Sequence, residues 1–344
     1  MIASPLRLRL DRDALVANWR MLAALSGPAA CGAAVKANGY GLGARKVVQH
    51  LAAAGCRDFF VATWAEALTL ADAGVAVSVL HGVREEDMAV ALGTTHARPV
   101  LNSVQQVRRW REAGGGACDV MVDTGMNRLG IRPEDVTAGL LDGLPVDTLM
   151  SHLASADEDA PLNARQRDAF AALRGRGGAR RMSLANSAGI ALGPDYAFDL
   201  TRPGIALYGA VPVPALAGRT RQVVTPEAQI LQRRLAPAGA SVGYNATWTA
   251  TVDTEVAIVN LGYADGYLRC FSGKGRAMRG DQVLPVIGRV SMDLTAVDVS
   301  AAPELAEGDW LAMDYDLPTV SALSGLSQYE LLTGLGARYD RIWG

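Results

Sequence analysis

Lys36 is the residue whose type and position best suit covalent chemistry. It closes the apolar run CGAAV and is followed at once by the glycine-rich stretch ANGYGLG, residues 37–43. Desolvation at the end of a buried strand lowers the pKa of a lysine amine, and a neutral amine can form a Schiff base with a carbonyl compound. The alternative interpretation is a solvated lysine beside a turn. Because the glycines are spaced GxGxG instead of GxGxxG, a dinucleotide-binding turn is disfavoured.

The elements that must position this lysine alternate between short apolar runs and polar-faced helical stretches. A helix is predicted over residues 11–27, where apolar residues recur at helical spacing behind a capping aspartate. Eight apolar runs then follow, most of them succeeded by a helical stretch, which is typical of a (β/α)8 barrel. At the carboxyl end of a barrel strand, Lys36 would point into the mouth where the catalytic groups of this fold lie.

A second domain is predicted from a change in the pattern of apolar and polar residues along the chain. The segment VPVPALAGRT, residues 211–220, contains two prolines and small residues and is followed by one strand-like run after another. We therefore expect a barrel domain over residues 1–219 and a mainly β domain over residues 220–344. No repeat of fixed period is visible in the sequence.

Composition excludes several classes of function. The 344 residues carry 33 Lys and Arg against 35 Asp and Glu, a net charge of -2 without a basic run, which disfavours a nucleic-acid partner. No segment has the apolar length of a membrane span or a signal peptide, so we expect a cytoplasmic protein. The four cysteines are scattered without metal-ligand spacing, and we expect reduced thiols and no metal.

Several segments of the sequence resemble the alanine racemase family. The lysine segment AVKANGYGLG is similar to the family's lysine motif, and further blocks follow in the family order: VDTGMNRLG, SHLASADE, ANSAG, RPGIALYG, VGYNATW, LGYADGY and GRVSMD. They extend over nearly the whole chain. The resemblance implies a TIM barrel followed by a β domain, pyridoxal 5'-phosphate as cofactor, and interconversion of L-alanine and D-alanine.

The resemblance also implies two acid/base groups. Lys36 would form the internal aldimine with the cofactor and exchange the substrate α-proton on one face, and Tyr244 in VGYNATW would serve the opposite face. In the family this tyrosine comes from the partner subunit, which implies a homodimer with shared active sites. A free phenol has a pKa of about 10, so neighbours such as His152 and Arg202 would have to stabilise a phenolate. Without the surrounding motif, a half-buried core residue of an alternating strand is the favoured interpretation of Tyr244.

The cofactor contacts follow from the same blocks. Arg202 resembles the arginine that hydrogen-bonds the pyridine nitrogen; since an arginine cannot accept that proton, it favours racemisation over transamination. His152 resembles the histidine packed against the cofactor ring, and Arg128 the arginine that reaches the cofactor oxygen and the substrate carboxylate. The phosphate would be held by Tyr40, Ser187, the backbone of Gly204 and Ile205, and Tyr339.

The remaining site residues concern the substrate. The backbone N–H of Met292 would bind the substrate carboxylate, according to the resemblance. Five residues match positions that line the entrance, and each could instead make ordinary surface contacts: Tyr263, Arg269, Arg289, Asp157 and Asp293.

Two positions depart from the family pattern. Met121 stands where many members carry a lysine that becomes carbamylated and hydrogen-bonds the arginine equivalent to Arg128. We hypothesise that Arg128 is held here by other groups, such as Asn127 or water, or is held less firmly. Asn245 stands where glycine is usual. Both changes bear on the substrate end of the site and leave the substrate range open.

Three alternatives compete with alanine racemisation. A broad-specificity or serine-type racemase is the nearest. Barrel-type amino-acid decarboxylases share the lysine motif, but they use a carboxylate where this chain has Arg202 and carry an HxGS block that is absent here. A non-catalytic barrel protein that binds pyridoxal phosphate would have no use for the residues after Arg219, including Tyr244.

Overall fold

The structure is a computed structural model that describes residues 4–344 and consists of two compact units. The barrel unit is Ala14–Arg221, and the strand unit is Gln222–Gly344 together with the described residues up to Asp13. The N-terminal strand therefore departs from the predicted domain division, in which it belonged to the barrel. In this strand, β1 (Leu6–Leu10), the leucines are buried and the arginines point outward, and it pairs with strands β11 and β19 of the strand unit.

Eight strand positions build the barrel, as predicted. Seven strands form a parallel sheet in sequence order, from β3 to β9. β10 pairs in parallel with β2, and the bond from Asp199 N–H to the Met182 carbonyl (3.0 Å) joins β10 to β9. β2 and β3 form one strand position interrupted at Gly32, so the barrel closes. The strands are β2 (Ala30–Cys31), β3 (Ala33–Ala34), β4 (Asp58–Val61), β5 (Ala76–Val79), β6 (Ala97–Leu101), β7 (Cys118–Met121), β8 (Val146–Met150), β9 (Arg181–Ser183) and β10 (Leu200–Thr201).

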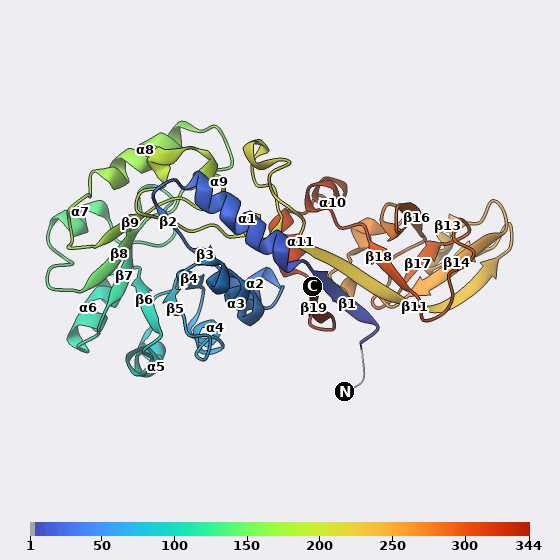
Figure 1. The fold of residues 1–344 in the computed structure, drawn as a ribbon, viewed down its shortest axis with the longest axis horizontal. Coiled ribbons are helices and arrows are strands. Elements are labelled where there is room, and N and C mark those ends of the chain that lie inside the picture. The colour runs from blue at the N-terminus through green and yellow to red at the C-terminus, as the bar shows by residue number, and fades with distance from the viewer. Residues whose placement is uncertain (1–3) are drawn as a thin grey trace. The chain divides into compact units, whose positions relative to one another are not determined.

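Helices surround these strands (Figure 1), and the helices α1, α3 and α6 each bury an apolar face. In α6, for example, Val107 and Trp110 are buried while the arginines face outward, and Ser103 caps the first turn by accepting from Gln106 N–H. The predicted first helix is confirmed as α1. The helices are α1 (Arg12–Leu25), α2 (Lys36–Tyr40), α3 (Ala44–Ala54), α4 (Trp64–Leu68), α5 (Met88–Gly93), α6 (Val104–Glu112), α7 (Pro133–Thr137), α8 (Pro161–Ala171) and α9 (Ser187–Ala191).

The amino ends of the barrel strands are closed by a network of buried charges. Asp119 is fully buried and accepts from Arg98 Nε (3.0 Å), Ser78 Oγ (2.6 Å) and Thr148 N–H (3.0 Å). Arg98 also pairs with Asp147 (2.9 Å). Since a buried charge is tolerated only when it is paired and hydrogen-bonded, this network fixes the register of neighbouring strands far from their carboxyl ends.

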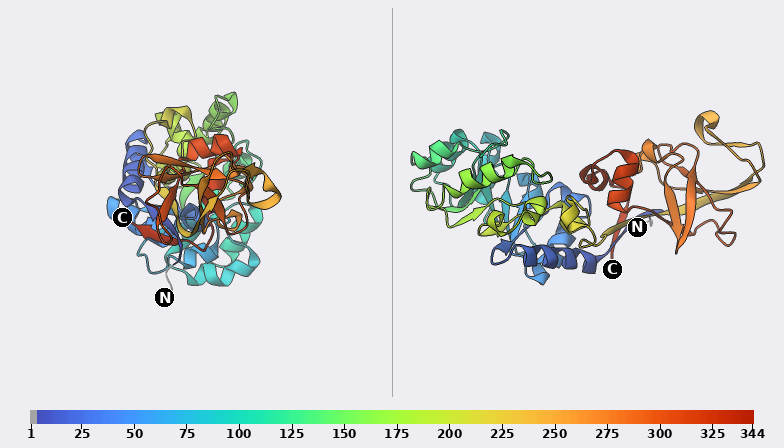
Figure 2. Two further views of the ribbon diagram at one scale, coloured as in Figure 1. Left: turned by 90° about the vertical axis from the view of Figure 1, so that its right-hand side faces the viewer. Right: turned by 90° about the horizontal axis from the view of Figure 1, so that it is seen from above.

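The strand unit is mainly antiparallel. Its strands follow the order β14-β17-β16-β15-β18-β11, and β14 also pairs with β11, so six strands close into a ring beside which β1 and β19 continue the sheet. Figure 2 shows these strands from two further sides, with β1 in dark blue, β11 in gold and the later strands in orange to red. The elements are β11 (Val224–Ala236), β12 (Ser241–Val242), β13 (Trp248–Thr249), β14 (Thr254–Val259), β15 (Arg276–Arg279), β16 (Gln282–Ile287), β17 (Thr295–Asp298), β18 (Trp310–Met313), α10 (Leu317–Ser324), α11 (Gln328–Thr333) and β19 (Asp340–Trp343).

Candidate active site at the carboxyl ends of the barrel strands

Lys36 lies where β3 ends, at the start of an unusual left-handed turn. Ala37, Asn38, Gly39 and Tyr40 have φ values of 51°, 53°, 65° and 54°. Left-handed backbone is disfavoured for residues with a side chain, so four in succession require anchoring from outside the turn. One anchor is the side chain of Asn38, which accepts from Ala44 N–H (3.0 Å). The turn brings Lys36 and Tyr40 to the mouth of the barrel.

The surroundings of Lys36 favour a neutral amine. Burial lowers the pKa of Lys36, the cations Arg128 and Arg202 lower it further, and the carboxylate of Glu66 opposes them. A lysine with a lowered pKa holds more neutral amine near pH 7 and is a better nucleophile and base.

Tyr40, Ser187 and Gly204 form a cradle of hydrogen-bonding groups. A β-carbon on Gly204 would lie 2.2 Å from the Tyr40 hydroxyl oxygen, so only glycine allows this approach. The Tyr40 ring stacks on Tyr208 at 4.7 Å, and Ser187 Oγ accepts from Gly204 N–H at 2.9 Å. The N–H of Ile205 begins a 3₁₀ turn and has no partner within that turn. Hydroxyls and backbone N–H groups gathered in this way suit an anion such as a phosphate.

Arg202 follows β10 and is held rigidly by neutral groups. Its side chain donates to Ser183 Oγ and to the Ser151 carbonyl (2.5 Å for the latter). Within the described residues it forms no ion pair with a carboxylate. Burial lowers the pKa of Arg202 to about 10, and the charge of Asp119 opposes this shift, so the guanidinium remains charged at neutral pH.

His152 follows β8 and is neutral. Burial lowers the pKa of His152 to about 3, assisted by Arg202, Arg128 and Lys36. Of the two groups expected to stabilise a phenolate, only Arg202 therefore carries a positive charge at neutral pH. The loop that carries His152 is fixed by Gln166 of α8, which donates to the His152 carbonyl (2.9 Å) and accepts from Ala154 N–H (2.8 Å).

Arg128 lies in the exposed loop after β7. Asp123 shapes this loop by accepting from Gly125 and Met126 N–H (2.8 and 2.9 Å). In residues 4–344 the Arg128 side chain makes no hydrogen bond or ion pair, including with Asn127, and Met121 is buried. Asn127 therefore does not hold the Arg128 side chain within these residues, and the other parts of the hypothesis, a water contact or a less firmly held arginine, stay predictions.

Tyr244 belongs to the strand unit and is 69% exposed there. It follows β12 and lines a largely apolar cavity of about 390 Å³ that also includes Ile258, Arg289 and Leu294. Asn245 has a φ of 62°, which explains why glycine suits this position and why asparagine is the most tolerant substitute. An exposed tyrosine beside an apolar hollow is unlike a core residue and is free to meet another surface.

Met292 and Tyr263 lie side by side in the strand unit. Tyr263 N–H donates to the Ser291 carbonyl and Ala264 N–H to the Met292 carbonyl, both at 3.0 Å, whereas the Met292 N–H has no partner in the described chain. The Arg269 guanidinium lies 5.1 Å from the centre of the Tyr263 ring.

The other predicted entrance and phosphate residues are divided between the units. Arg338 joins Asp293 (2.7 Å) to the buried Asp265 (2.6 Å), next to the buried Tyr339. Asp157 is exposed in the barrel unit, in the loop after β8. The barrel strands bring together eight of the predicted residues: Lys36, Tyr40, Arg128, His152, Ser187, Arg202, Gly204 and Ile205. Apart from Asp157, the remaining predicted residues lie in the strand unit.

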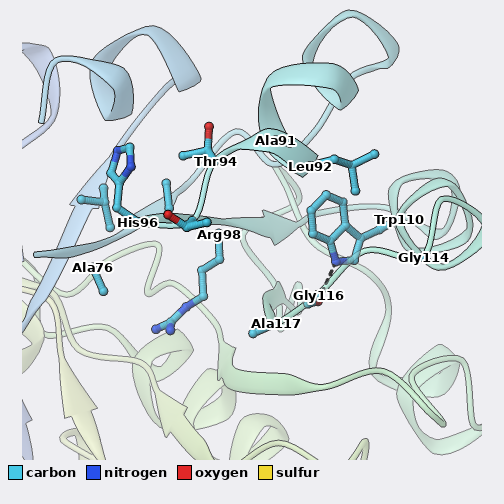
Figure 3. A pocket seen from close by; sticks show the side chains of 13 residues that line it. Ala76, Ala91, Leu92, Thr94, His96, Arg98, Trp110, Gly114, Gly116 and Ala117 are labelled. Carbon is cyan, nitrogen blue, oxygen red and sulfur yellow. Dashed lines mark hydrogen bonds between the residues drawn. The ribbon is translucent and has the colours of Figure 1, made fainter. Parts of the chain in front are cut away.

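A second cavity, of about 290 Å³, lies at the amino ends of the barrel strands (Figure 3). Its polar groups are already satisfied: Arg98 pairs with Asp119 and Asp147, Trp110 Nε1 donates to the Gly116 carbonyl (3.0 Å), and His96 Nε2 lies 3.0 Å from the Ala67 carbonyl. This cavity is at the opposite end of the strands from Lys36. In the described part of the chain no group of three His, Cys, Asp or Glu residues could hold a metal ion, and no helix has the length and apolar character to span a bilayer.

The residues whose hydrogen bonds support the site are not identified from the sequence. Gln166 donates to the backbone of His152, and Ser151 and Ser183 accept from the Arg202 side chain. Glu66 accepts from the N–H of Ala37, the residue directly after Lys36. Glu66 lies three residues after Thr63 at the start of a helix, a signal that indicates only a cap; its contact with residue 37 is not visible in the sequence.

Comparisons with known proteins cover almost the whole chain. The model of the alanine racemase N-terminal domain matches residues 10–212, and that of the C-terminal domain matches residues 223–343. Alanine racemase from Acidiphilium cryptum is 42% identical over 97% of this chain and 98% of its own length, and that from Rhodospirillum rubrum is 44% identical over 98% and 95%. The crystal structure of alanine racemase from Bartonella henselae with covalently bound pyridoxal phosphate is similar with a TM-score of 0.89 at 35% identity, over 99% of this chain and 100% of that one.

The barrel with its lysine, the antiparallel second unit and these relatives define the class of the protein as an amino acid racemase. Both domain models match in order, and relatives above 40% identity cover almost the full length. The chain belongs to the alanine racemase family.

Proposed function

We propose that this chain interconverts L-alanine and D-alanine with pyridoxal 5'-phosphate as cofactor, by a two-base mechanism. The observation that carries the proposal is the position of Lys36, a partly buried amine at a strand end, among cations and beside a cradle of hydroxyls and N–H groups. This donor set fits a phosphorylated aldehyde, because it offers an amine for the carbonyl and neutral donors plus positive charge for the phosphate.

When bound, the cofactor supplies an aldehyde that condenses with amines and a ring that withdraws electrons from the substrate α-carbon, which acidifies its hydrogen. The hydroxyls of Tyr40 and Ser187 and the N–H of Ile205 would hold the phosphate, and Tyr339 would complete this set. The Gly204 N–H, which donates to Ser187 Oγ in this structure, would exchange that acceptor for the phosphate. The neutral ring of His152 would pack against the cofactor without adding charge.

Arg202 would set the type of reaction. Its guanidinium is fixed by Ser183 and Ser151 and stays protonated, so it can donate a hydrogen bond to the pyridine nitrogen and cannot take a proton from it. A carboxylate in its place would keep that nitrogen protonated and favour transamination. Arg202 thus favours rapid return of a proton to the substrate α-carbon.

Two bases would exchange the proton on opposite faces. The Lys36 amine would take or return it on one face, and Tyr244 would act on the other. The 69% exposure of Tyr244 and its apolar surroundings support its insertion into the barrel mouth of a second copy, which makes the enzyme a homodimer with shared sites. The Arg128 side chain and the unpartnered Met292 N–H would bind the substrate carboxylate.

We place the enzyme in the cytoplasm, acting on small amino acids without a nucleic-acid or membrane partner, in agreement with the net charge of -2. A broader racemase that also accepts serine is the second candidate. It is favoured by the unpartnered Arg128, since a less firmly held arginine tolerates more than one way of binding the substrate.

The test is the loss of optical activity from pure L-alanine and from pure D-alanine with added pyridoxal phosphate. We expect the wild type to racemise both, Lys36→Ala to be inactive, and Lys46→Ala, an exposed lysine of α3, to match the wild type. Faster racemisation of serine than of alanine would favour the second candidate. A wild type that binds the cofactor and leaves both amino acids unchanged would contradict racemisation.

A further inference from the structure

Glu66 in α4 accepts hydrogen bonds from the backbone that follows two neighbouring strands, β3 and β4. Its Oε1 accepts from Ala37 N–H and its Oε2 from Ala62 N–H, each at 2.7 Å. Ala37 directly follows Lys36, and Ala62 directly follows β4. β3 and β4 are parallel neighbours, and their last ladder bond runs from Val35 N–H to the Phe60 carbonyl (2.8 Å). One carboxylate therefore continues the connection between two strands at the point where the ladder ends.

We infer that Glu66 is a positioning residue for Lys36. The Glu66 carboxylate fixes the first peptide of the left-handed turn and thereby aims the lysine amine at the cofactor aldehyde. The inference deepens the proposed function and rests on it. Glu66 does not touch the reacting atoms through these bonds; it acts through the backbone of residue 37.

The left-handed turn explains why such a residue is needed. Ala37, Asn38 and Tyr40 are not glycines and yet have positive φ, so the turn persists only if its surroundings hold it. Asn38 and the carbonyls of Val35 and Ala37 anchor its middle and end. The N–H of Ala37, next to the lysine, is anchored by Glu66.

A carboxylate is the group that this geometry requires. Two N–H donors from different strands approach two oxygens of one side chain, and both bonds are charge-assisted. A glutamine offers one acceptor oxygen and would turn its NH₂ towards the other donor. An aspartate keeps the charge and is one methylene shorter. Glu66 itself is held at the start of α4, where its N–H donates to Thr63 Oγ1 (3.3 Å).

The charges around Lys36 allow two possible roles of Glu66 to be distinguished: positioning of the turn, and compensation of the lysine charge. Arg128, Arg202 and the neutral His152 face the lysine from other strands, and Glu66 is the carboxylate that favours its protonated form. If Glu66 served only as a counter-charge, its loss would shift the pH dependence of Lys36 to lower pH and leave the turn unchanged. Aspartate would then replace it fully.

The experiment uses the full chain with Glu66→Gln and Glu66→Asp. Glu112→Gln, an exposed glutamate at the end of α6, is the matched control. One readout is hydrogen exchange of the backbone amides in residues 37–44. The second is the pyridoxal phosphate concentration that half-saturates Lys36, measured from pH 6 to 10 by borohydride reduction and peptide mass.

We expect both Glu66 variants to exchange amides of residues 37–44 faster and to need about tenfold more pyridoxal phosphate at every pH, while the control matches the wild type. The inference is overturned if Glu66→Asp behaves as the wild type and Glu66→Gln only shifts the pH midpoint. Wild-type exchange in both variants would overturn it as well. If wild-type Lys36 captures no pyridoxal phosphate, the proposed function fails, and the exchange measurement still decides whether Glu66 fixes the turn.

Discussion

The Tyr40 hydroxyl oxygen occupies the space that a side chain at position 204 would need: a β-carbon on Gly204 would lie 2.2 Å from it. We therefore predict that Gly204→Ala displaces Tyr40 and raises the half-saturating concentration of pyridoxal phosphate about tenfold or more. Fluorescence titration of the cofactor-free protein measures this. Tyr40→Phe keeps the stack on Tyr208 and removes only the hydroxyl, so it should weaken binding less than Gly204→Ala; the reverse order would contradict the steric account.

Breaking the buried network at the amino ends of the strands should lower the stability of the barrel unit. Replacing Asp119 by asparagine removes one buried carboxylate acceptor while Arg98 keeps its pair with Asp147, and we expect a loss of about 1–3 kcal/mol in the free energy of unfolding. Urea unfolding followed by tryptophan fluorescence measures it. As a control, Asp72→Asn breaks an exposed pair with Arg45 and should move the midpoint far less; equal shifts would show that burial is not the cause.

His152 should make the folded protein sensitive to acid. Because its folded pKa is about 3 and the unfolded value is about 6.5, the stabilising contribution of the neutral ring is complete above pH 6.5 and is lost as the pH falls towards 3. His152→Gln removes this titrating group. It should reduce the pH slope of the unfolding free energy in this range by up to about 1.4 kcal/mol per pH unit. Urea unfolding at pH 5 and pH 7 tests this, and an unchanged slope would mean that His152 is protonated in the fold.

At position 245, glycine should replace asparagine without loss of activity, and most other residues should not. Its φ of 62° is easy for glycine, acceptable for asparagine and strained for a β-branched residue. We expect Asn245→Gly to keep the racemisation rate within about twofold, and Asn245→Val to lower kcat by about tenfold or more through misplacement of Tyr244. Thermal melting of both variants separates misplacement from unfolding, and an active Asn245→Val would argue against the backbone explanation.

Much of the fold could be predicted from periodicity. The apolar runs that become β4 to β9 and the helix α1 have patterns set by burial, which is a local property of the sequence. The expected barrel domain over residues 1–219 includes the residues of β1, because the alternation LRLRL carries no information about the strands with which it pairs. Its pairing with β11 and β19 joins residues more than two hundred positions apart.

The sequence supports a proposal of which residues form the site, but it does not predict their geometry. Lys36 was placed at a strand end from its neighbours, whereas the positive φ of Ala37, Asn38 and Tyr40 contradicts the intrinsic preference of these residue types. Such a conformation is imposed by long-range bonds, of which the bond from Ala37 N–H to Glu66 is one. Support for Arg202 likewise comes from Ser151 and Ser183, on other strands.

The most direct test of the two-base account is α-hydrogen exchange of L-alanine and D-alanine in D₂O, followed by NMR in the wild type and in Tyr244→Phe. We predict that Tyr244→Phe still exchanges the α-hydrogen of one enantiomer, the one that faces Lys36. Exchange of the other enantiomer should fall by about a hundredfold or more. Equal exchange of both enantiomers by Tyr244→Phe would contradict the assignment of Tyr244 as the second base.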